Sequence, residues 1–391
     1  MGGDDRGWLL KEVVCGICNT EVFSPLEAKV MRASPLSIAR LFLQTRTRKR
    51  GKKTSAPSIR APISYFDDPQ SGLLLEQELG GSGQSRVWPQ VNFVPPERMI
   101  VSATNVASAN ELRRNLEALA DLLTVCEKTR EGLEVRYRLT PLRWDGLAYE
   151  VGESDGVAAP PRDAIWLEPL EYPKTETAGT LTARVFRRAK GPITCRADCV
   201  GDVASLLTLI RHNHAKLVVP AGTTSISTET PSIHLRQAID PVAYNRVLVK
   251  IAVNVCAHLF GDEAVRTPAF ARAREYARYG TGSVVQLPIE HAKRITATFP
   301  PLPHHHLLLV YAKAPSAGEP GHVMINMQFY GGIVHSYLIA VGDSVPTSAE
   351  PIFVVVDFEA NSIEGHSPDG FAQFAGSIGA LWRDTAFDPD S

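Results

Sequence analysis

The sequence has no excess of positive charge, no long apolar run and few cysteines, and each of these absences excludes a class of protein. Its 391 residues contain 41 Lys and Arg against 42 Asp and Glu, a formal charge of -1, so no global basic balance points to nucleic acid. No apolar run reaches the roughly 18 residues that a membrane-spanning helix needs, which predicts a protein outside the membrane. Six cysteines in a chain of this length do not form a disulfide framework, which favours a reducing, cytoplasmic location.

Targeting and nucleotide-binding motifs are also lacking. Asp4, Asp5 and Arg6 precede only a short apolar stretch, which is not typical of a signal peptide. The Gly/Ser stretch at 80–83 lacks the Gly-Lys-Ser/Thr ending of a phosphate loop, and neither a nucleophile elbow nor a dinucleotide fingerprint is present. Acyl transfer, nucleotide hydrolysis and hydride transfer therefore have no support. A mean hydropathy of -0.07 is typical of an ordinary globular chain.

What the sequence does contain is one Cys-x-x-Cys pair close to its start. Cys15 and Cys18 follow a short β-branched run, and Asn19 comes directly after them. Such a pair at the end of a strand directs two thiolates at one tetrahedral metal ion. From Thr20 onward, apolar residues recur at helical spacing, so we expect a helix to begin after Asn19. The Asn19 side-chain oxygen would then lie where it can meet a hard ion such as Mg²⁺.

Two stretches of the chain resemble bacterial HNH endonucleases, the ββα-metal family, in the branch whose zinc-binding pair is Cys-x-x-Cys-Asn. The first stretch follows the cysteine pair and is carried by Cys18-Asn19, Phe23-Ser24, Leu26-Glu27, Ser34-Pro35-Leu36 and Ala39-Arg40. Gly2-Gly3 is also similar to the linker between the two halves of the family's module. The second stretch, 244–280, resembles the helical pair that follows the nuclease module in the same proteins.

The resemblance implies a metal-dependent endonuclease that hydrolyses the phosphodiester bonds of DNA. Cys15 and Cys18 would form half of a structural Zn²⁺ site, which the other half-site of the family completes. Asn19 would be a ligand of the catalytic Mg²⁺ or Mn²⁺, and Glu27 would stand behind it as a supporting partner. In this chemistry an imidazole activates water for attack on phosphorus, while a divalent ion stabilises the departing oxygen.

The first half of the HNH module is not found ahead of Cys15. In the family an earlier Cys-x-x-Cys and an acidic-His pair, typically Glu-His-x-x-Pro, come before the Gly-Gly. Only fourteen residues precede Cys15 and none is a histidine, since all eleven histidines lie at or beyond His212. We therefore expect either a truncated or misassigned start or a natural remnant. The chain as given should cleave DNA poorly or not at all, because the base is missing.

A basic run follows the first HNH-like stretch. The segment 45–53, TRTRKRGKK, carries six positive charges in nine residues: Arg46, Arg48, Lys49, Arg50, Lys52 and Lys53. One interpretation is a solvated linker. The other, favoured by its position, is a loop that neutralises phosphates and gives sequence-independent affinity for duplex DNA or for a structured RNA.

The apolar periodicity predicts an α+β protein with three regions. These are a partial zinc-knuckle unit with its basic tail at 1–55, a mixed middle region at 56–235, and a helix pair with an antiparallel sheet at 236–391. We expect helices at 34–43, 110–129, 202–217, 240–260 and 267–279. Short strands are expected at 88–94, 99–102, 133–139, 148–151, 165–170 and 181–186, and longer ones at 306–313, 323–330, 333–341 and 352–358. The rest of 54–96 is expected to be loop, and 368–370 a tight turn.

The remaining metal-binding residue types give weaker patterns. Cys195 and Cys199 would complete a four-thiolate site only by pairing with Cys15 and Cys18; otherwise they are two reduced thiols in a strand or turn. His212 and His214, two residues apart on a helix, point to different faces. The run at 304–306 lies at a strand entry, and we expect no metal there.

Two functions from different classes remain open on this sequence. The first is the HNH-type endonuclease. The second is a nucleic-acid-binding or protein-interaction module that lacks catalysis because the histidine-bearing half is missing. An upstream reading frame that restores the Glu-His segment would favour the enzyme, and a nearby stop codon would favour the module.

Overall fold

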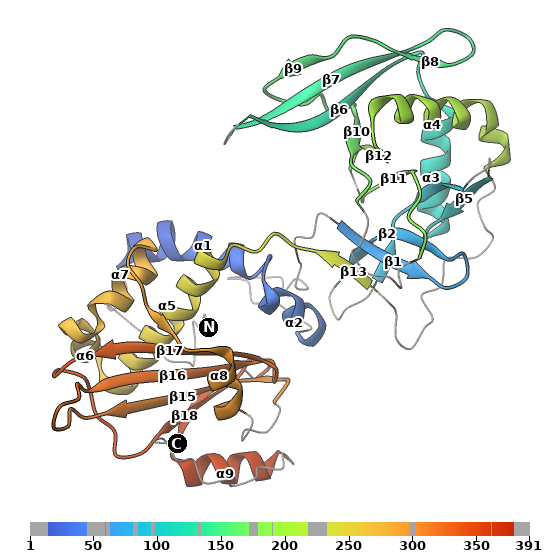
Figure 1. Ribbon diagram of the computed structural model, residues 1–391. Coiled ribbons are helices and arrows are strands. Elements are labelled where there is room, and N and C mark those ends of the chain that lie inside the picture. The colour runs from blue at the N-terminus through green and yellow to red at the C-terminus, as the bar shows by residue number, and fades with distance from the viewer. Residues whose placement is uncertain are drawn as a thin grey trace. The chain divides into compact units, whose positions relative to one another are not determined.

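The computed structural model describes residues 15–44, 59, 63–80, 85–94, 98–131, 134–171, 179–189, 191–217, 233–296, 302–360 and 362–378. The chain divides into two compact units (Figure 1). Unit 1 comprises Met1–Arg60, Gly81–Gly83 and Gln237–Ser391, and unit 2 comprises Ala61–Gly80 and Gln84–Arg236. The N-terminal segment thus belongs to the same unit as the C-terminal region. Both units combine helices with largely antiparallel strands, so the predicted α+β class is confirmed.

Unit 1 is built on an antiparallel six-stranded sheet with helices on both faces (Figure 1). Its strand order is β14-β17-β16-β15-β18-β19. The strands are β14 Val285–Gln286, β15 His305–Lys313, β16 His322–Phe329, β17 Ile333–Val341, β18 Ile352–Asp357 and β19 Ser362–His366. The four long strands predicted in the last third of the chain are therefore confirmed.

The apolar runs of these strands arise because the sheet is buried on both faces. Along β15, Leu308 and Val310 pack with the helices α5 (Pro241–Phe260) and α7 (Ala271–Tyr279), whereas Leu307 and Leu309 pack on the other side with Phe371 of α9 (Pro368–Ser377). A strand covered on both faces carries apolar residues at every position instead of at alternate ones. The continuous run in β15 follows directly from this arrangement.

A tight turn joins β16 to β17, two of the strands that the sequence predicts. Tyr330 has a φ of 51° and Gly331 a φ of 71°, both in the left-handed region. Phe329 pairs with Ile333, so residues 330–332 form the connection, and the Gly332 N–H donates to the Phe329 carbonyl over 3.1 Å. Two successive positive φ values reverse the chain in the sense that suits the twist of the strands. Gly331 adopts this conformation without steric cost, and the Tyr330 ring packs against those of His306 and Phe358.

The helices of unit 1 come from both ends of the chain. They are η1 Cys18–Phe23, α1 Ser24–Val30, α2 Pro35–Leu43, α5 Pro241–Phe260, α6 Asp262–Arg266, η4 Pro268–Phe270, α7 Ala271–Tyr279, α8 Ile289–Thr296 and α9 Pro368–Ser377. The predicted start of α5 is confirmed, because the Asp240 carboxylate accepts a hydrogen bond of 2.9 Å from the Ala243 N–H and Pro241 is the first helical residue. None of the helices within the described residues has both the length and the apolar character needed to cross a bilayer.

Unit 2 contains two sheets and two main helices. The smaller sheet has the order β13-β1-β2-β3, from β1 Ile63–Asp68, β2 Leu73–Leu79, β3 Ser85–Val87 and β13 Ile233–Arg236. The larger one follows the path β5-β4-β11-β12-β10-β6-β7-β8, with β9 paired to β7. Its strands are β4 Gln90–Val94, β5 Arg98–Ser102, β6 Leu122–Glu131, β7 Glu134–Trp144, β8 Tyr149–Val151, β9 Asp155–Val157, β10 Ile165–Glu168, β11 Arg184–Arg187 and β12 Ile193–Arg196. The helices α3 Val106–Glu117 and α4 Val200–Asn213, which the short η3 His214–Lys216 follows, pack on this sheet.

Three predictions of local structure are wrong. The helix expected over 110–129 ends at Glu117, and 122–131 forms β6 between β7 and β10. Leu122 is 61% exposed, so the leucine stripe does not continue past the helix, and Thr124, Val125 and Thr129 suit the strand. The loop expected over much of 54–96 instead contains β1 and β2. Pro368 begins α9 instead of a turn, because the Ser367 hydroxyl caps that helix at the Gly370 N–H, 3.2 Å away.

Candidate functional site

Cys15 and Cys18 lie at the start of the first helical segment, with their side chains turned toward each other. The Cys18 N–H donates to the Cys15 sulfur over 3.2 Å, and the Cys18 thiol also hydrogen-bonds to that sulfur. Cys15 is exposed, whereas Cys18 is 7% exposed. Helical conformation begins at Gly16, so Cys18 and Asn19 lie inside the helix and not before it as predicted. Residues three apart on a helix face each other, which explains the contact between the two thiols.

The two thiols have different proton affinities. The hydrogen bond from Cys18 lowers the pKa of Cys15, with further help from the Cys18 N–H. The same bond raises the pKa of Cys18, since the Cys18 proton is the one that is shared, and burial adds to the effect. The positive charge of Arg278 favours the thiolate form of both residues. Cys15 is therefore the group that carries the negative charge when the pair loses one proton.

The helical segment that carries this pair is fixed to α5 by apolar packing and by charge. Cys18, Phe23 and Val30 belong to the same buried cluster as the inner face of α5. The Lys250 ammonium forms an ion pair with Glu27 and lies 4.9 Å from the centre of the Phe23 ring. Lys29 meets Asp240, the cap of α5, at 2.5 Å. The two stretches with the HNH resemblance, more than 200 residues apart, thus pack against each other in unit 1.

A cavity opens beside the cysteine pair, between η1, α5 and α7. Its volume is about 450 Å³, and its lining includes both cysteines and Phe23. Among the described residues of its lining, four side chains are cationic and one is a carboxylate: Lys250, Arg266, Arg274, Arg278 and Glu275. Three of the cations already have partners, because Lys250 pairs with Glu27, Arg266 with Asp262, and Arg274 with the backbone oxygens of 265 and 267. Arg278 lies 5.0 Å from the centre of the Tyr279 ring and close enough to the thiols for its charge to act on both.

The other predicted site residues have different surroundings. Asn19 is exposed next to the cysteine pair but does not line the cavity. Glu27 pairs with Lys250, so its carboxylate is directed at α5 and not at Asn19. The basic run, with Arg46, Arg48, Lys49, Arg50, Lys52 and Lys53, lies outside the described residues. Among the residues that line the cavity within the described part of the chain, there is no histidine.

The cysteine pair fits half of a zinc site. Two sulfurs in hydrogen-bond contact suit a shared tetrahedral ion, which needs four ligands. The described residues contain no group of three or more His, Cys, Asp or Glu side chains that could hold a metal ion. A complete zinc site is therefore not formed by the described residues.

Cys195 and Cys199 lie in unit 2 and differ from each other. Cys195 is fully buried in β12, and burial raises its pKa to about 12. Cys199 is exposed at the start of α4, where the Asp202 carboxylate accepts a hydrogen bond of 3.2 Å from its N–H. Both are free thiols, Cys195 in a strand and Cys199 in a bend directly before a helix, and their pairing with Cys15 and Cys18 stays a prediction.

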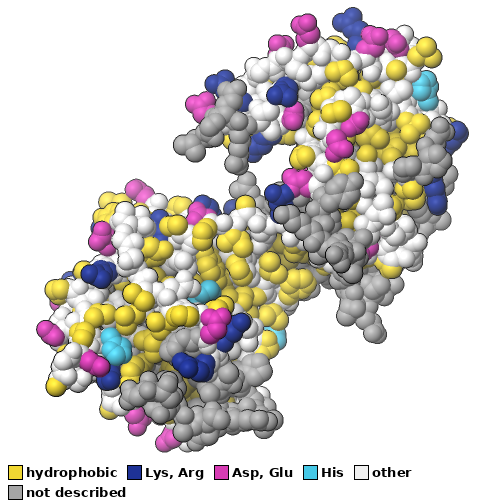
Figure 2. All heavy atoms as spheres, viewed as in Figure 1, with side chains coloured by type: hydrophobic (Ala, Val, Ile, Leu, Met, Phe, Trp, Pro, Cys, Tyr) yellow, Lys and Arg dark blue, Asp and Glu magenta, His cyan; other side chains and the backbone are white. Residues whose placement is uncertain are grey.

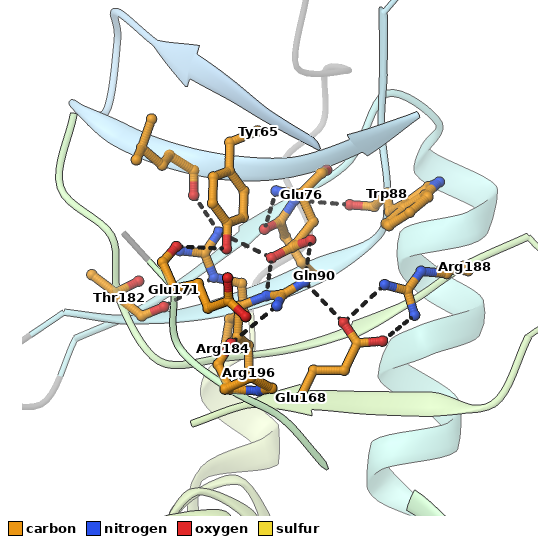
Figure 3. A network of polar contacts seen from close by, with 12 residues as sticks. Tyr65, Glu76, Trp88, Gln90, Glu168, Glu171, Thr182, Arg184, Arg188 and Arg196 are labelled. Atoms are coloured by element: carbon orange, nitrogen blue, oxygen red, sulfur yellow. Dashed lines mark hydrogen bonds and ion pairs between the residues drawn. The ribbon is translucent and has the colours of Figure 1, made fainter. Parts of the chain in front are cut away.

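A buried charge network in unit 2 is a feature that the sequence patterns do not predict (Figure 3). Arg196 forms a two-point contact with Glu76, at 2.6 and 3.2 Å, and reaches Glu168 at 2.9 Å. Glu168 also accepts two hydrogen bonds from Arg188, at 2.7 and 2.9 Å. Glu76 comes from β2 of the smaller sheet, Glu168 and Arg196 come from β10 and β12 of the larger sheet, and Arg188 directly follows β11. The network therefore joins the two sheets through ion pairs, with the buried Arg184 guanidinium also 3.9 Å from Glu76, which is a structural role. The sequence gives little signal for it, because Gln77 and Glu78 follow Glu76 directly and the three form one polar stretch.

The charged surface gives no separate indication of a partner. On the face that Figure 2 shows, Lys and Arg side chains are interspersed with Asp and Glu side chains over both units. Comparison of the chain with protein-family models, with curated proteins and with solved structures finds no match.

Proposed function

We propose that this chain is an HNH-type, metal-dependent DNA endonuclease and that unit 1 binds the sugar–phosphate backbone. The observation that carries the proposal is the packing of the Cys-x-x-Cys-Asn segment against α5 and α7. Both segments resemble the same family, and their contact in unit 1 is what two parts of one functional module require. The resemblance assigns Asn19 to the divalent metal and the cysteine pair to zinc.

The cations around the cavity support binding to an anionic backbone. Arg278 lies beside the cysteine pair on α7, and the exposed Arg272 stands on the same short helix. Guanidinium groups form hydrogen-bonded ion pairs with phosphate, and each neutralised phosphate releases counterions from the duplex. With a net formal charge of -1, the protein has affinity for DNA only where such groups are gathered locally.

The proposal is tested by binding of the full chain to a fluorescein-labelled DNA duplex at several salt concentrations. Arg278→Ala should weaken binding and make the slope of log K against log salt shallower by about 0.9, the value for one duplex phosphate contact. The matched control is Arg113→Ala on α3 of unit 2, another partly exposed helical arginine, here paired with Glu117. Equal losses of affinity for the two variants, or unchanged affinity for Arg278→Ala, would contradict a phosphate contact at the cavity.

A plasmid-nicking assay with Mg²⁺ or Mn²⁺ separates the two functions left open by the sequence. Nicking that Asn19→Ala abolishes supports the endonuclease. DNA binding without Asn19-dependent nicking supports a binding module without catalysis. A duplex RNA of the same length, measured in parallel, identifies the preferred nucleic acid, since a contact with phosphates alone discriminates weakly between the two.

A further inference from the structure

The cavity between η1, α5 and α7 has an apolar interior and a charged, aromatic rim. Phe23, Val265 and Ala277 line it and belong to the buried core cluster of unit 1. The exposed charged and aromatic side chains of the lining form its rim: Arg266, Glu275, Arg278 and Tyr279. A contact with the phosphates of the DNA backbone uses the rim alone, so it gives the apolar interior no role.

Tyr279 is an aromatic side chain that this rim presents to solvent. It is 59% exposed, and the Arg278 guanidinium lies 5.0 Å from the centre of its ring. Proteins that bind unpaired strands use aromatic side chains together with arginines, because every base has a π-face that can stack on a ring. The neighbouring guanidinium then binds the phosphate of the same nucleotide.

Asn254 adds a hydrogen-bonding group to the lining. It lies on α5 and is partly buried, and its side-chain amide forms no hydrogen bond within the described part of the chain. An amide both donates and accepts, so it can pair with the polar edge of a base. The cavity therefore offers an apolar surface for a ring, an amide for the edge of that ring and a cation for a phosphate.

We propose that this cavity receives one unpaired nucleotide of the bound DNA. The base enters the apolar interior and stacks on Tyr279, Asn254 hydrogen-bonds to its edge, and Arg278 binds its phosphate. A volume of about 450 Å³ lies within the range of roughly 300–1,000 Å³ that small-molecule sites have. A paired base stays inside the stack unless its pairing is broken, so an unpaired nucleotide fills the cavity at lower cost. This inference rests on the proposed function and specifies its substrate as DNA that contains an unpaired nucleotide.

The test measures binding of the full chain to two fluorescein-labelled duplexes, one fully paired and one with a single unpaired nucleotide. The second should bind roughly tenfold more tightly, a gain within the range that stacking of one base on an aromatic side chain supplies. Tyr279→Ala should remove this preference, and Tyr279→Phe, which keeps the ring, should retain it. Asn254→Ala should weaken binding of the second duplex roughly fivefold, the value of one hydrogen bond, and leave the paired duplex unchanged.

Two controls separate base recognition from the greater flexibility of a bulged duplex. A duplex with an unpaired abasic residue lacks the base, so it should bind like the paired duplex. Phe42→Ala is the matched variant, because Phe42 on α2 is the other exposed large aromatic side chain among the described residues, and it should leave the preference unchanged.

The outcomes distinguish this inference from the proposed function. Arg278→Ala should weaken binding of both duplexes by the same factor, since both present phosphates. Equal affinity of the wild type for the two duplexes, or a preference that persists in Tyr279→Ala or with the abasic residue, would overturn the nucleotide site. The backbone contact would still stand in those cases, because binding of the paired duplex reports it separately. No binding of either duplex would overturn both.

Discussion

His335 is a titratable side chain held neutral beneath α5. Its ring lies against Tyr244, with 2.8 Å between Nε2 and the tyrosine oxygen. Burial lowers the pKa of His335 to about 4 and raises that of Tyr244, so neither group carries charge near neutral pH. A neutral polar pair of this kind stabilises the fold only while the imidazole stays unprotonated.

This pair gives a pH-dependent prediction. The folded-state pKa of His335 lies below the unfolded value of 6.5, so its contribution is complete above that pH and is lost as the pH falls from 6.5 toward about 4. The loss amounts to about 1–3 kcal/mol after allowance for partial solvent access. Hydrogen exchange of the β16 and β17 amides should show unit 1 losing this stability on acidification. In His335→Gln the stability of unit 1 should depend less on pH over the same range. An unchanged pH dependence would show that His335 does not protonate there.

At the scale of elements, the attachment of the helical segment η1–α1 to α5 depends mainly on one aromatic side chain. Phe23 is 7% exposed within the core cluster of unit 1, with the Lys250 ammonium over its ring. The ion pairs around it are at least partly open to solvent, as with Lys29 and Asp240, and surface pairs of this kind contribute only about 0–1 kcal/mol each. Apolar burial therefore decides whether the cysteine pair stays beside the cavity.

Phe23→Ala should detach this helix from α5 while the sheet of unit 1 stays folded. Loss of a buried phenylalanine costs about 3–5 kcal/mol, which exceeds what the remaining contacts of so short an element supply. The measurement is the rate at which Cys18 is alkylated, which should rise steeply because its burial depends on this packing. Phe42→Ala on α2 is the control, since Phe42 is 46% exposed and its removal should leave the rate unchanged. Equal alkylation of Cys18 in the wild type and in Phe23→Ala would show that other contacts hold the helix.

Local patterns predict an element well where its own residues determine it. The strands β15 to β18 and the helix α5 could be predicted, because burial on both faces and the Asp240-Pro241 cap are visible in the sequence. The end of α3 could not, because β6 forms through pairing with β7 and β10, and such pairing overrides the helical spacing of the leucines. The turn expected at 368–370 failed because Ser-Pro-Asp-Gly suits both a reversal and a helix start.

At the scale of the whole molecule, the site depends on contacts between residues that lie on opposite sides of unit 2 in the sequence. The cysteine pair could be predicted from its spacing, but its association with Lys250 and Arg278 could not. More than 220 residues separate those partners, and no periodicity spans the interval. The charge network of unit 2 escaped prediction for the same reason, since Glu76 and Arg196 are 120 residues apart. Sequence patterns thus name candidate residues, and only the fold shows which of them meet.

Substitutions in the basic run at 45–53 test whether nucleic-acid binding extends beyond the cavity. If its arginines bind phosphates, Arg46, Arg48 and Arg50 changed together to Ala should weaken DNA binding without regard to sequence. The salt slope should become shallower by about 0.9 for each phosphate that the variant no longer neutralises.

The matched control removes three exposed arginines of unit 2, Arg113, Arg136 and Arg138, and changes the net charge equally. A slope that falls in both triple variants would reflect net charge alone, and an unchanged slope in the first would make the run a solvated linker. Only a weakening confined to the basic run identifies a phosphate-binding segment, because counterion release depends on where the charges meet the backbone and not on their sum.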